Sequence, residues 1–186
     1  MLRKHLLSPL LIGLSLSALS TATLAGKKPI CHTFEGTFTI TADTSCGVTQ
    51  LSGRRYWYPD VQFLSELGVP DSCFSGSITG TLDGLPMIGT TLSAQTLNNF
   101  PILDTKQLFT AVTVLDASTA QGHKLGKLVF KDTGVLDLTN YLANEQLIIT
   151  AGTGYFKHVT GSIAVAGNEF AGASLNGQIC ISSKKH

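Results

Sequence analysis

The stretch AGTGYFKHVTGSIAVAG, residues 151–167, decides between two folds for this chain. A glycine loop that binds the phosphates of a dinucleotide has the spacing Gly-x-Gly-x-x-Gly and leads into a helix. Here Lys157 stands where the third glycine belongs, and the residues Val159–Val165 are β-branched and alternating rather than helical. The stretch therefore predicts a turn between two strands, 146–150 and 161–166, because glycine reaches positive φ at little cost.

Period-two alternation recurs along the chain and predicts an all-β fold. In residues 33–41, phenylalanine, glycine and isoleucine fall on one face and threonine and glutamate on the other. The segment 107–115 (QLFTAVTVL) is apolar on both faces, as in a strand buried on both sides. Further strand candidates are 75–82, 87–97, 127–131, 146–150, 161–165 and 175–181. Eight or nine strands separated by turn signals indicate a sandwich or a barrel.

One segment, residues 60–67, has the pattern of a short helix. Asp60 is placed to cap its start, and Val61, Leu64 and Leu67 fall at helical spacing. Gly68, followed by a proline two residues later, ends it.

The first 25 residues have the layout of a secretory signal peptide: a basic start, an apolar run and small residues before a cleavage site after Ala25. A membrane anchor is the alternative, but the apolar run is too short to span a bilayer. Export to the periplasm or the medium is therefore expected. Residues 26–186 have a length suited to one domain.

The mature chain shows no charge pattern typical of a nucleic-acid-binding protein. Removal of two of the 13 basic residues, Arg3 and Lys4, leaves 11 against 12 acidic ones, a net charge near −1. The basic residues are scattered along the chain. A bacterial outer-membrane barrel would carry paired aromatic girdles, which the few aromatic residues here do not form. We therefore expect a soluble protein with no stable membrane span.

Four cysteines, Cys31, Cys46, Cys73 and Cys180, lie in the mature part. An even number in an exported chain predicts two disulfides, with three possible connectivities. A metal site is the alternative. It is disfavoured because no Cys-x-x-Cys pair exists and Cys31-His32 is the one adjacent pair of ligand types. We expect neither a metal nor a cofactor.

The segment Gly152-Thr153-Gly154-Tyr155-Phe156-x-x-Val159-Thr160-Gly161-Ser162-Ile163 is similar to the Gly-Thr-Gly-x-Phe-x-x-Ala-x-Gly segment of the allene oxide cyclase and dirigent barrel superfamily. The preceding residues 128–137 resemble the strand and turn of its secreted members, and the match spans residues 122–181. The resemblance implies an eight-stranded antiparallel barrel with an apolar lumen, often a trimer in plants. Active members use polar lumen residues to steer cyclisation of an epoxide or coupling of radicals. The predicted helix and the cysteines depart from the plant pattern, and no catalytic residue carries over.

A barrel of this kind brings its first and last strands together. Cys31 precedes the first predicted strand and Cys180 lies in the last one. Given that fold, the favoured pairing is Cys31 with Cys180 and Cys46 with Cys73.

The densest cluster of polar and aromatic residues is Arg54, Arg55, Tyr56 and Trp57. These residues are candidates for a ligand-binding pocket mouth, with arginine holding a carboxylate and an aromatic ring packing on the ligand. The alternative is a strand end whose aromatic rings cover the barrel. Glu35 is a further candidate, since a lumen carboxyl with a raised pKa can serve as an acid or base. On the outer face it would be a solvated charge.

Three other polar residues have weaker patterns. Asp132 and Asp137 flank Gly134 and are expected to support a turn. His158 is either a proton carrier or a loop histidine. The sequence contains no Gly-x-Ser-x-Gly elbow, His-Glu-x-x-His motif or calcium loop, so the families that use those motifs are disfavoured.

Two functions from different classes fit these observations. The first is a secreted barrel that binds an apolar or amphipathic small molecule in its lumen, with or without a cyclase- or isomerase-like activity. The second is a secreted, non-enzymatic interaction protein with a filled barrel and a binding outer surface. A continuous cavity with converging polar groups favours the first, and a filled lumen favours the second. A monomer and a homotrimer both fit.

Overall fold

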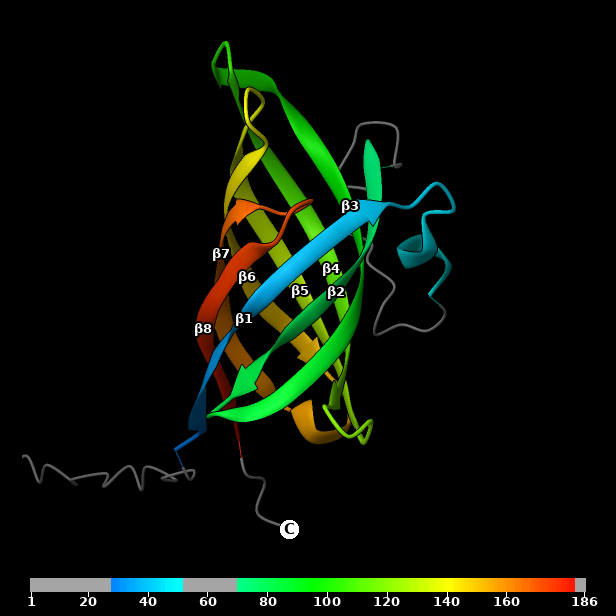
Figure 1. The fold of residues 1–186 in the computed structure, drawn as a ribbon, viewed down its shortest axis with the longest axis vertical. Coiled ribbons are helices and arrows are strands. Elements are labelled where there is room, and N and C mark those ends of the chain that lie inside the picture. The colour runs from blue at the N-terminus through cyan, green and yellow to red at the C-terminus, as the bar shows by residue number, and fades with distance from the viewer. Residues whose placement is uncertain (1–27, 52–69, 183–186) are drawn as a thin grey trace, which may run out of the picture.

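A computed structural model describes residues 28–51 and 70–182, with backbone alone at 98–103. The chain forms a closed, eight-stranded antiparallel barrel in which each strand pairs with the next and the last pairs with the first (Figure 1). The strands are β1 (Ile30–Ala42), β2 (Ser72–Leu82), β3 (Leu85–Leu103), β4 (Lys106–Thr119), β5 (Lys124–Asp137), β6 (Leu142–Gly152), β7 (Val159–Asn168) and β8 (Ala173–Ile181). Two 3-10 turns accompany them, η1 (Gly47–Gln50) and η3 (Gly154–Phe156). The predicted eight-stranded barrel is confirmed.

Closure of the barrel places the cysteines in pairs. Cys31 on β1 lies directly opposite Cys180 on β8 in the strand register, and the two form a disulfide. A second disulfide joins Cys46, beside η1, to Cys73 on β2. This is the connectivity that barrel closure favours. Two disulfides indicate an oxidising compartment, extracellular or periplasmic.

The barrel interior is packed with apolar side chains along most of its length. Nineteen buried residues form this core, and Phe34, Phe130 and Phe156 are its largest fully buried members. The turns β2–β3 and β4–β5, η3, the start of β1 and the end of β8 lie at one end, at the bottom of Figure 1. We call this the closed end, because Phe156 and its neighbours fill it. The end where β1 finishes and β2 begins is the open end.

A smaller apolar cluster lies on the outer face of β3, β4 and β5. Val48 of η1 covers Ala94, Val112, Val114 and Val129 there. The disulfide between Cys46 and Cys73 holds η1 against this face. The cover explains why 107–115 is apolar on both faces: Val112 and Val114 pack under η1, while Leu115 belongs to the interior.

The stretch 151–167 forms the predicted turn at the closed end. It runs from β6 through η3 into β7, and it is bound to β5 because the Thr153 amide donates to the Lys127 carbonyl at 2.9 Å. Gly154 has φ +60°, a left-handed conformation, and a Cβ at this position would collide with the Leu125 carbonyl oxygen. Glycine is therefore required here for both conformation and space.

The substitution Gly154→Ala is expected to lower the free energy of unfolding by about 3 kcal/mol, because left-handed strain and the collision with β5 add together. The matched control is Gly122→Ala. Gly122 also has positive φ, +85°, but nothing lies within 4 Å of its added Cβ. The control should lose only about 1 kcal/mol in urea titration. Equal losses for the two variants would contradict the close approach between η3 and β5.

One strand differs from the sequence-based expectation in a way that matters for function. The strand predicted at 127–131 continues to Asp137, because Asp132-Thr133-Gly134 pairs with both β4 and β6 instead of turning. The prediction that Asp132 supports a turn is therefore wrong.

The signal peptide, the helix predicted at 60–67 and the cluster at 54–57 lie outside the described residues. In the part of the chain that is described, no helix is long and apolar enough to cross a membrane.

Candidate functional site

A cavity of about 140 Å³ opens at the open end of the barrel. It lies above the packed interior, and its wall receives residues from β1, β2, β3, β4, β5 and β6. The lining residues are Ile40, Ser72, Phe74, Gln95, Leu97, Phe109, Leu136, Tyr141, Ala143, Glu169 and Phe170. We call it the mouth cavity.

Three aromatic side chains form one side of the mouth cavity. The rings of Phe74 and Phe170 meet edge to face with centroids 5.9 Å apart, and the rings of Tyr141 and Phe170 do so at 6.3 Å. Phe170 and Tyr141 remain about half exposed, at 51% and 55%. A ligand that enters the cavity therefore passes an aromatic rim.

Two turns position this rim, and each is held by a side-chain cap. In the β7–β8 turn, the Phe170 amide donates to Asn168 Oδ1 at 3.0 Å. The Ile40 amide of β1 donates to the Glu169 carbonyl oxygen at 2.9 Å, which holds this turn over the barrel opening. In the β5–β6 turn, the Thr139 amide donates to Asp137 Oδ1 at 2.9 Å. Asp137 thus supports a turn, but this turn follows β5 and is not the one expected around Gly134.

Below the mouth cavity, three carboxyl groups lie close together. Asp132 on β5 lies opposite Leu147, and Glu145 on β6 lies opposite Val165. Both partners belong to the core, so both carboxyl side chains are on the inward-facing side of their strands. Glu169 comes from the β7–β8 turn and lines the mouth cavity. The charge of Glu169 raises the pKa values of both Asp132 and Glu145. We call these three residues the acidic cluster.

The hydrogen bonding of the acidic cluster is incomplete. Thr113 Oγ1 on β4 donates to Asp132 Oδ2 at 2.5 Å, but Asp132 Oδ1 is buried and has no hydrogen-bond partner among the described residues. The same holds for Glu169 Oε1. Asp132 as a whole is only 4% exposed. Buried polar atoms are nearly always satisfied in native proteins, so two unpaired acceptors in one cluster, one of them on Glu169 in the wall of the mouth cavity, indicate a place for a bound donor.

Burial and mutual repulsion raise the pKa values of these three carboxyls. Burial raises the pKa of Asp132 to about 8, which the Thr113 hydrogen bond partly offsets and the Glu169 charge reinforces. Burial, together with the charges of Asp132 and Glu169, raises the pKa of Glu145 well above its usual range. Burial raises the pKa of Glu169, and the hydrogen bond from Glu145 partly offsets this. No basic side chain among the described residues contributes to any of these three pKa shifts.

Such a cluster has two chemical uses. A carboxylic acid kept neutral near pH 7 can donate a hydrogen bond, and it can ionise when a positive group arrives. Coordination of a metal is not supported, because no group of three or more His, Cys, Asp or Glu among the described residues is arranged to hold an ion.

The structure places the sequence-predicted candidates as follows. Glu35 is exposed on the outer face of β1, so of its two alternatives the structure supports the solvated charge and not the lumen acid or base. His158 lies in the exposed turn after η3, at the end opposite the mouth cavity. Arg54, Arg55, Tyr56 and Trp57 lie outside the described residues, and their role at a pocket mouth stays a prediction.

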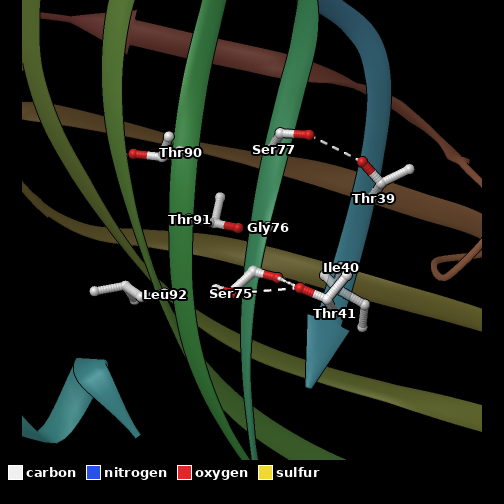
Figure 2. A pocket seen from close by; sticks show the side chains of 9 residues that line it. All are labelled: Thr39, Ile40, Thr41, Ser75, Gly76, Ser77, Thr90, Thr91 and Leu92. Atoms are coloured by element: carbon white, nitrogen blue, oxygen red, sulfur yellow. Dashed lines mark hydrogen bonds between the residues drawn. The ribbon is translucent and has the colours of Figure 1, made fainter. Parts of the chain in front are cut away.

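A second concave surface lies outside the barrel, over β1, β2 and β3, and measures about 430 Å³ (Figure 2). Its wall is rich in hydroxyl groups that bond to one another. Thr39 and Ser77 are 2.9 Å apart and Thr41 and Ser75 are 3.2 Å apart, oxygen to oxygen. We call this surface the hydroxyl groove. It carries no ionisable group.

Comparison of the chain with models of known protein families, with curated proteins and with solved structures finds no match. The candidate site is therefore assigned from its own geometry.

Proposed function

We propose that this protein is a secreted barrel that binds a small amphipathic molecule at the open end of its lumen. The observation that carries the proposal is the mouth cavity, where an apolar wall meets the buried Glu169 Oε1, which accepts no hydrogen bond from the described residues. Ligand sites combine an apolar lining with a few placed polar groups in this way. The packed closed end limits the ligand to the upper part of the barrel.

The cavity volume sets the size of the ligand. A dry cavity of about 150 Å³ holds one benzene ring. The mouth cavity, at about 140 Å³, therefore fits one ring or a short alkyl chain, and a longer molecule would extend past Phe170 into solvent.

Binding of benzyl alcohol to the mature protein tests this proposal. We expect saturable ¹⁵N–¹H chemical-shift changes at Gln95, Phe109, Ala143 and Glu169, which line the mouth cavity. Ala143→Leu should abolish them, because Ala143 is 2% exposed and a larger side chain there fills the cavity. Ala164→Leu, on the exposed face of β7, is the matched control and should bind normally.

A second variant guards against misfolding of Ala143→Leu. Phe170→Ala removes part of the aromatic rim without touching the barrel core and should weaken binding several-fold. If benzyl alcohol produces no saturable shifts, or if neither Ala143→Leu nor Phe170→Ala changes them, the mouth cavity is not a ligand site.

We also propose kinship with the allene oxide cyclase and dirigent barrels, including a cyclase- or isomerase-like activity as an extension of ligand binding. The Gly152–Phe156 turn and the eight-stranded antiparallel barrel support this. A protonated carboxyl such as that of Asp132 is suited to act as a general acid.

The second candidate function is that of an interaction protein that binds a partner on its outer surface. The packed interior and the hydroxyl groove favour it. Its test is crosslinking of the exported protein in its host. Ser77→Arg, in the groove, should abolish capture of a specific partner, whereas Ala143→Leu should leave capture unchanged. The opposite pattern would exclude the groove as the binding surface.

A further inference from the structure

We propose that the ligand of the mouth cavity carries a protonated amine, which binds to the acidic cluster while its apolar part packs against the aromatic rim. This inference rests on the proposed function and specifies the chemical class of the ligand.

The first argument is the set of unpaired acceptors. Asp132 Oδ1 and Glu169 Oε1 are buried and accept no hydrogen bond from the described residues. An ammonium group offers three N–H donors and no acceptor, so it can donate to both of these oxygens. The Glu145 carboxyl, which already bonds to Glu169, is the third group within reach of the same charge.

The second argument is charge. Three carboxyls gather here, and no basic side chain among the described residues compensates them. An anionic ligand would meet repulsion from any carboxyl that ionises, and a neutral ligand would not favour ionisation. A cation compensates the charge as Asp132 or Glu169 ionises, and the carboxyl proton passes to solvent.

The third argument is the aromatic rim, which is independent of the carboxyls. Phe74, Tyr141 and Phe170 form a continuous edge-to-face group at the entrance. Aromatic rings attract cations through their faces and pack well on hydrocarbon. The combination of aromatic rim and buried carboxyls favours an aryl- or alkylamine over a polar cation such as an inorganic ion.

The test uses three probes with one ring and different charge: benzylamine, benzyl alcohol and benzoate. At pH 8 we expect benzylamine to bind at least about tenfold more tightly than benzyl alcohol, because charge-assisted hydrogen bonds are about twice as strong as neutral ones. Benzoate should show no binding. Calorimetry in two buffers of different ionisation enthalpy should show proton release with benzylamine and none with the alcohol.

The affinity for benzylamine should rise between pH 6 and pH 8, as ionisation of the acidic cluster becomes easier. An alkylamine, like a lysine side chain, stays protonated throughout this range. The groups that face the amine are Asp132, Glu145 and Glu169, with Thr113 from β4 as the neutral neighbour. The affinity for benzyl alcohol should stay constant with pH.

Asp132→Asn should reduce the affinity for benzylamine by about tenfold or more and leave that for benzyl alcohol within about twofold. Glu35→Gln, an exposed carboxyl on the outer face, is the matched control and should change neither. If benzylamine binds no more tightly than benzyl alcohol, or if Asp132→Asn weakens both equally, the amine inference is wrong while lumen binding stands. If none of the three probes binds, both proposals fail.

Discussion

Replacing Cys31 and Cys180 together by serine is expected to lower the free energy of unfolding by about 5 kcal/mol. The disulfide joins residues 149 positions apart, so its loss releases nearly the whole chain in the unfolded state. Cys31 is exposed, so serine fits its position. The measurement is urea unfolding of the wild type and the double variant under the same non-reducing conditions.

The second disulfide provides the comparison. Cys46–Cys73 closes a loop of only 27 positions, and its chain-entropy contribution is about 3.5 kcal/mol. Its loss also frees Val48 from the outer face of the barrel, which adds a packing loss. A loss below about 2 kcal/mol for the Cys31–Cys180 variant would show that strand pairing between β1 and β8 closes the barrel without help from the crosslink.

The protein is expected to be about 4 kcal/mol less stable at pH 8 than at pH 5. Asp132 has a pKa of about 8 in the folded barrel and 3.8 as its ordinary value. Between these values the folded state holds a proton that the unfolded state has lost. The contribution of Asp132 to the free energy of unfolding is therefore fully present near pH 4. It falls as pH rises towards 8, by up to about 1.4 kcal/mol per pH unit.

Glu145 and Glu169 have raised pKa values and act in the same direction. Asp43 and Asp83 have lowered pKa values, since hydrogen bonds from Ser45 and His32 stabilise their charged forms. The contribution of these two carboxylates to the free energy of unfolding is lost only as pH falls below about 4, which is outside the range from pH 5 to pH 8.

The test is urea unfolding at pH 5, 6, 7 and 8 for the wild type and Asp132→Asn. The variant should have a shallower dependence on pH and be the more stable protein at pH 8, because its amide never has to hold a buried charge. Stability that rises with pH, or an unchanged slope in the variant, would contradict the burial of a protonated Asp132.

The sequence predicts the strands and the turn at residues 152–156, because alternation and glycine punctuation report directly on strands and their connections, whereas the choice of a barrel over a sandwich depends on the family resemblance. It was misleading at Asp132, because Asp-Thr-Gly is a frequent turn sequence and β5 was expected to end before it. The signal that would have found Asp132 is the parity of its strand: it shares a face with Leu128 and Phe130, both in the core.

Glu145 and Glu169 could not be placed from the sequence. Glu145 lies near the start of β6 among polar neighbours, and Glu169 lies in a turn. Their proximity to Asp132 depends on how the β7–β8 turn lies over the opening, which the Ile40 amide determines through a contact about 130 residues away in the chain. Contacts of this kind have no local signature.

The start of β1 and the end of β8 both lie at the closed end, which has a practical consequence. A fluorescent protein, a bead or a second domain joined on the C-terminal side of β8 would be attached at the end of the barrel opposite the β7–β8 turn and its aromatic rim. The barrel can therefore be immobilised through its C-terminal side with its entrance oriented outward. An array built in this way would present every entrance to the sample, as a sensor surface requires.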